Sequence, residues 1–93
     1  MSTDLRQLPA RRPDVSLQDD GDDTVLVTPS GTTYVLNPTA RAIWELCDGT
    51  TTIDELVTAI AEVFAVDRAT ATHDVTATID QFRAAGLVES THR

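Results

Sequence analysis

Apolar and polar positions follow a short-range pattern in the first part of the chain and helical spacing in the rest. Three short segments rich in Val, Leu and Thr, at about 15–18, 24–28 and 32–36, are typical of strands. Gly21 and Gly31 stand in the links between them, where glycine allows the positive φ of a tight turn. Because parallel strands need a long crossover and these links are short, we expect an antiparallel meander with 32–36 at its edge.

Capping signals and apolar spacing predict three helices after the last strand. The first covers about 38–47, where Asn37 can accept from the free amides and proline occupies the first helical position. The second begins after Thr52, which forms a capping-box pattern with Glu55. The third covers about 68–85. These elements predict an α+β fold, a three-stranded antiparallel sheet followed by three helices.

The apolar positions with the clearest period predict a core between the sheet and the helices. Trp44, the only tryptophan, lies on the apolar stripe of the first helix. The predicted core residues are Val25, Val27, Ile43, Trp44, Leu56, Ile60, Val75, Ile79 and Phe82.

A chain of 93 residues is the size of one domain. Residues 1–12 show no apolar periodicity, and 90–93 follow the last apolar pair, so both are expected to be tails. The predicted domain covers residues 13–89.

The net charge of −8 weighs against nucleic acid as a partner, because an acidic chain repels phosphate backbones. No apolar run approaches the roughly 20 residues of a membrane span, and the N-terminal residues lack the pattern of a signal peptide. The single cysteine, Cys47, cannot form an internal disulfide, which is usual in a reducing compartment. These features predict a cytoplasmic protein that does not contact a membrane.

No cluster of residues in the sequence is typical of catalysis. Cys47 lies on an apolar helical stripe, where a cysteine most often serves as a small core residue. His73 and His92 have no partner at metal-ligand spacing, and the acidic run 19–23 lacks the spacing of a calcium loop. We therefore expect no catalytic residues, no metal, no cofactor and no enzymatic activity.

Two surface features remain as candidates for binding. The edge strand 32–36 leaves backbone groups that could pair with another chain. The third helix carries Thr70, Thr72, Thr76 and Thr78, which are poor helix formers because β-branching restricts their rotamers. Such a helix is either a merely tolerated, partly buried element or the weakly polar wall of a shallow groove. The residues alone indicate an edge strand beside a helix.

Several segments in this order resemble the PqqD-like family, over about residues 12–89. No single segment is catalytic, but the ordered set is fairly specific. The segments are Pro13-Asp14-Val15, Asn37-Pro38-Thr39-Ala40, Ile43-Trp44, Asp48-Gly49, Thr52 to Glu55, Asp74-Val75 and Gly86-Leu87-Val88.

The resemblance implies a winged helix-turn-helix-like domain of the kind called a RiPP recognition element. Such domains bind the leader segment of a ribosomally synthesised precursor peptide and present it to modifying enzymes. The leader adds as a strand to the sheet and lies against the third helix, which is β-augmentation. The peptide-binding residues implied on this chain are Thr32, Thr33, Tyr34, Val35, Leu36, Val75, Thr78, Ile79 and Phe82.

The resemblance also favours a stand-alone, monomeric leader-binding protein that works with a leader peptidase in lasso-peptide biosynthesis. Three alternatives stay open at this point. They are a chaperone for the precursor of pyrroloquinoline quinone, a winged-helix DNA-binding regulator, and a structural subunit or interaction module with no peptide ligand. The DNA reading would place the third helix in the major groove, but that helix offers only Arg68 and Arg83 against Asp74 and Asp80.

Overall fold

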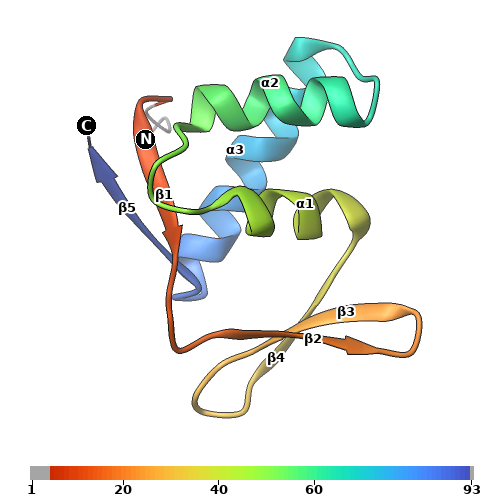
Figure 1. The fold of residues 1–93 in the computed structure, drawn as a ribbon, viewed down its shortest axis with the longest axis vertical. Helices are drawn as coiled ribbons and strands as arrows, with labels where there is room; N and C mark the ends of the chain where they lie inside the picture. The colour runs from red at the N-terminus through yellow and green to blue at the C-terminus, as the bar shows by residue number, and fades with distance from the viewer. Residues whose placement is uncertain (1–4, 93) are drawn as a thin grey trace.

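The chain is described by a computed structural model over residues 5–92 (Figure 1). Three helices follow an antiparallel sheet, so the expected α+β fold is confirmed; the winged-helix likeness stays a prediction. In chain order the elements are β1 (Gln7–Arg11), β2 (Ser16–Asp20), β3 (Asp23–Val27), β4 (Thr33–Leu36), α1 (Pro38–Leu46), α2 (Ile53–Val63), α3 (Arg68–Ala84) and β5 (Val88–His92).

The strands β2, β3 and β4 form the predicted meander, in that order and antiparallel throughout. Among the described residues β4 pairs on one side only, with β3, so the expected edge position is confirmed. Figure 1 shows this sheet at one end of the molecule, below α1, with α3 passing behind α1 and α2.

The face of β3 that is buried is not the face that the sequence predicts. Leu26 is fully buried and Thr24 nearly so, whereas Val25 and Val27 are half-buried on the opposite face. Side chains alternate between the two faces of a strand, so an error of one position in the buried residue exchanges all buried side chains of the strand for exposed ones. The prediction that Val25 and Val27 belong to the buried core is therefore wrong, and Leu26 takes their place.

The strands β1 and β5 form a second sheet that the local pattern does not predict. The expectation of tails at 1–12 and 90–93 is wrong for the residues in these strands; residues 1–4 and 93 lie outside the described part. Besides pairing with β5, β1 reaches the loop after α1: the Arg11 amide donates to the Cys47 carbonyl at 2.9 Å, and the Gly49 amide donates to the Pro9 carbonyl at 3.0 Å. Regular structure thus extends beyond 13–89 at both ends.

The helices begin where their caps predict. The Asn37 side chain accepts from the Ala40 amide at 2.8 Å, and both bonds of the capping box between Thr52 and Glu55 are present. The helices bury one stripe each against a common core. Its fully or almost fully buried side chains include Ile43, Trp44, Leu56, Ile60, Val75, Ile79 and Phe82, as predicted.

Candidate functional site

The open edge of β4 is the first part of the candidate site. The side chain of Val35 points away from the core and is 68% exposed, whereas Leu36 is buried at 8%. Tyr34 is half-buried and packs against the core. Thr32 lies in the turn before the strand, where its carbonyl accepts from the Thr28 amide at 3.0 Å.

The direction of the backbone groups along β4 follows from that turn. Because the Thr32 carbonyl points at β3, and because direction alternates along a strand, the amides of Tyr34 and Leu36 also face β3. The N–H and C=O groups of Thr33 and Val35 therefore face the open edge. An incoming strand can bond to these two residues.

A hollow of about 280 Å³ lies at the carboxyl end of β4, and it is the second part of the site. One wall is the start of α1, which follows β4 directly, and the other is the middle of α3. Its lining residues are Asn37, Thr39, Asp74, Ala77, Thr78 and Gln81. The side chains of this hollow are mostly polar and neutral, so it can accept a hydrogen-bonding group.

Of the α3 residues expected to bind peptide, only Thr78 lines this hollow. Val75, Ile79 and Phe82 are exposed by 0%, 0% and 4%. The expectation that these three residues form the wall of a groove is wrong, because their side chains fill the core. The residues that face the hollow stand one position earlier: Asp74, Thr78 and Gln81 precede the three core residues.

A second hollow, of about 490 Å³, lies at the other end of α1 and is lined in part by Trp44 and Glu45. The arginines at its rim already have partners. Arg11 donates to the carbonyls of Trp44 and Glu45, and Arg12 pairs with Glu89 at 3.2 Å. These interactions tie β1 and the residue after it to α1 and to β5, so the two arginines have a structural role.

The thiol of Cys47 is not available at the surface of the domain. Cys47 is fully buried, its Sγ donates to the Ile43 carbonyl at 3.1 Å, and burial raises the pKa of its thiol to about 12. Within residues 5–92 no group of three His, Cys, Asp or Glu side chains could hold a metal ion. No helix in this range is long and apolar enough to cross a membrane.

The state of Cys47 gives a direct prediction. The thiolate is the reactive form, so the native chain at pH 8 should not react with Ellman's reagent over an hour. The same sample in 8 M urea should release one equivalent within minutes, which serves as the internal control. Stoichiometric reaction of the native chain would show that Cys47 is accessible and would reopen a chemical role for it.

The open edge of β4 and the polar hollow at its carboxyl end are features that strand-addition recognition of a peptide uses. The profile of the family described as "Coenzyme PQQ synthesis protein D (PqqD)" matches residues 23–88. Since this match covers more than half of the chain, the chain belongs to the PqqD family. No curated protein sequence matches the chain significantly.

Three solved structures share the fold. TbiB1 in complex with the TbiA(beta) leader peptide has a TM-score of 0.73 at 26% identity, over 86% of this chain and 94% of that one. Lasso peptide synthetase B1 complexed with the leader peptide has a TM-score of 0.69 at 25% identity, over 88% and 98%. The PqqD truncation of Methylobacterium extorquens PqqCD, a stand-alone RiPP recognition element, has a TM-score of 0.73 at 23% identity, over 87% of both chains.

Proposed function

We propose that the chain binds the leader segment of a ribosomally synthesised precursor peptide and presents it to the enzymes that modify or cleave it. The observation that carries the proposal is the open edge of β4 beside the hollow on α3 in a domain of the PqqD family. Support comes from two similar structures, TbiB1 and lasso peptide synthetase B1, which are both complexes with leader peptides. The second of these structures supports a lasso-peptide pathway. A separate leader peptidase as the partner enzyme is part of the proposal.

The peptide should lie antiparallel to β4. The backbone groups of Thr33 and Val35 bond to it, whatever its sequence. Side chains on one face of the peptide enter the hollow beside Thr78, and those on the other face lie beside Val35. In this proposal the chain binds and presents the peptide and leaves the chemistry to its partners. The support is that Cys47 is buried and protonated, and that no group of three His, Cys, Asp or Glu side chains among residues 5–92 could hold a metal ion.

The DNA-binding alternative is disfavoured by the charges of α3. Arg68 pairs with Asp54, and Arg83 with Asp80 and with the Gln7 side chain. Both cations that this helix could offer to phosphates are thus already neutralised, on a chain of net charge −8.

A titration followed by amide chemical shifts tests the proposal. Three probes are added separately to the labelled chain: the leader segment of a precursor peptide encoded beside its gene, the precursor of pyrroloquinoline quinone, and a short DNA duplex. We expect saturable shifts at Thr33, Val35 and Thr78 with the first probe only. Shifts with the second probe alone would assign the chain to the quinone pathway. Largest shifts on α2, with β4 unchanged, would contradict the site, and submicromolar duplex binding at physiological salt would favour the DNA reading.

A further inference from the structure

The lining of the hollow beside β4 includes one charged residue, Asp74. Its side chain is half-buried, and no hydrogen bond or ion pair to another residue is present for it in the described part of the chain. Other carboxylates of the helices differ from it. Asp54 pairs with Arg68, Asp80 with Arg83, and Glu45 with Arg41.

The arginine distribution leaves no internal partner for Asp74. Arg41 lies in α1 shortly after Thr39 of the hollow, and it pairs with Glu45 at 3.2 Å and with Asp19 at 3.4 Å. Arg83, further along α3, is held by Asp80 at 2.8 Å and by Gln7 at 2.9 Å. The strand β4 carries no charged residue. A carboxylate that is partly removed from water without a partner loses hydration, so a cation placed beside it would be stabilised.

The remaining lining fits a cation with several donors. Thr39, Thr78 and Gln81 offer hydroxyl and amide oxygens around Asp74, which can accept the further N–H groups of an ammonium or a guanidinium. The net charge of −8 adds a long-range attraction for a basic peptide. Charge complementarity thus acts both at the hollow and over the whole domain.

We propose that Asp74 is a specificity-determining residue, which selects a leader peptide with a Lys or Arg side chain on the face that enters the hollow. This inference rests on the proposed function, because it takes the peptide to lie along β4. Backbone bonds to Thr33 and Val35 do not discriminate between peptides, so selection has to come from contacts such as this one.

The test uses a phage-displayed library of random 12-residue peptides, selected separately on the wild-type chain, on Asp74→Asn and on Asp80→Asn. Asp80→Asn is the control for charge, because it removes the same charge from an exposed position of the same helix that does not line the hollow. It also breaks the ion pair with Arg83, and an exposed pair of this kind contributes little. We expect enrichment of Lys or Arg at one position with the wild-type and Asp80→Asn chains, and loss of that enrichment with Asp74→Asn.

A selected peptide then gives the affinity. Asp74→Asn should weaken its binding about fivefold to tenfold at low salt, and Asp80→Asn less than about twofold. Replacing the basic residue of the peptide by Gln should remove the difference between Asp74→Asn and wild type, as expected for a direct pair. Binding to wild type should also fall more steeply with added salt than binding to Asp74→Asn.

The outcomes separate this inference from the proposed function. Peptides that shift the amides of Thr33 and Val35 but show no basic preference, or one that survives Asp74→Asn, would overturn the role of Asp74 and leave the function intact. Selected peptides that leave β4 unchanged, or a library that yields no binder, would overturn both.

Discussion

Replacing Val35 by proline should weaken leader binding by about tenfold to a hundredfold while leaving the domain folded. The N–H of Val35 faces the open edge of β4, so the substitution removes a donor that only the peptide uses. The peptide carbonyl that loses this donor is left unpaired at a cost of about 1–3 kcal/mol. Each 1.4 kcal/mol corresponds to about a tenfold change in affinity. Isothermal titration with the leader segment measures the effect.

Two controls define that result. Val35→Ala keeps the N–H and should bind within a few-fold of wild type, which separates the backbone donor from the side chain. The melting temperature of Val35→Pro should stay close to that of Val35→Ala, because the side chain is 68% exposed and the N–H does not bond to β3. Wild-type affinity in Val35→Pro would show that the peptide does not add to β4.

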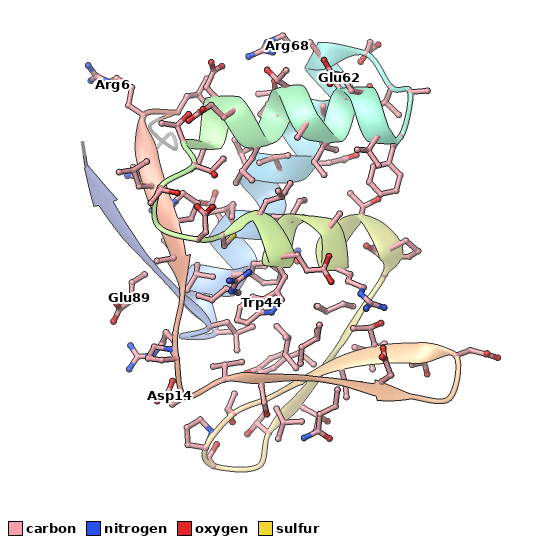
Figure 2. The ribbon with its side chains drawn as sticks, in the orientation of Figure 1. Arg6, Asp14, Trp44, Glu62, Arg68 and Glu89 are labelled. Carbon is pink, nitrogen blue, oxygen red and sulfur yellow. The ribbon has the colours of Figure 1, made fainter. Side chains whose placement is uncertain are left out.

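Truncating Trp44 should have the largest effect on stability. Its side chain is 3% exposed, and Figure 2 shows it between α1 and the sheet. Its ring meets that of Phe82 edge to face, with centroids 5.7 Å apart at 86°. Trp44→Ala leaves a cavity and should lower the free energy of unfolding by about 3–5 kcal/mol. The whole free energy of unfolding of a domain is roughly 5–15 kcal/mol. Urea unfolding of the two chains gives the difference.

Val63→Ala is the matched control for Trp44→Ala. Val63 is also a helical apolar residue but is 70% exposed, so its truncation should change stability by less than about 0.5 kcal/mol. Trp44→Phe keeps an aromatic ring beside Phe82 and should lie between Trp44→Ala and wild type. An unchanged melting temperature in Trp44→Ala would place Trp44 outside the core, in spite of its burial.

The parts of the fold set by local chemistry were predictable. Asn37 and Thr52 cap the first two helices as the sequence indicates, because a cap needs only a side-chain oxygen three residues before an amide. The edge position of β4 followed from short links, which leave an antiparallel meander as the simple solution.

The features set by distant contacts were not predictable from local pattern. Every residue of 24–28 is β-branched or apolar, so nothing in that segment shows that Leu26 rather than Val25 faces the helices. The strand β1 contains a proline and pairs with β5 from the opposite end of the chain, and neither strand has an apolar alternation of its own.

In the candidate site, too, the sequence predicts what local pattern determines and misses what distant contacts determine. Helical periodicity finds the buried stripe of α3, and that stripe is then easily mistaken for a groove wall. The face that borders the hollow carries Asp74, Thr78 and Gln81, which look like an ordinary solvated surface in the sequence. Only the position of the start of α1 against α3, fixed by tertiary packing, marks these residues as a site.

The junction of β4 with α1 determines which partner, the domain or the peptide, loses conformational entropy on binding. Leu36 is anchored in the core, Asn37 is held by its bond to Ala40, and Pro38 fixes its own φ, so no flexible loop separates strand from helix. The receiving edge is thus already ordered, and only the peptide has to give up backbone freedom, at about 1–2 kcal/mol per residue. A leader that is pre-extended by cyclisation should therefore bind more tightly, without any new contact to the domain.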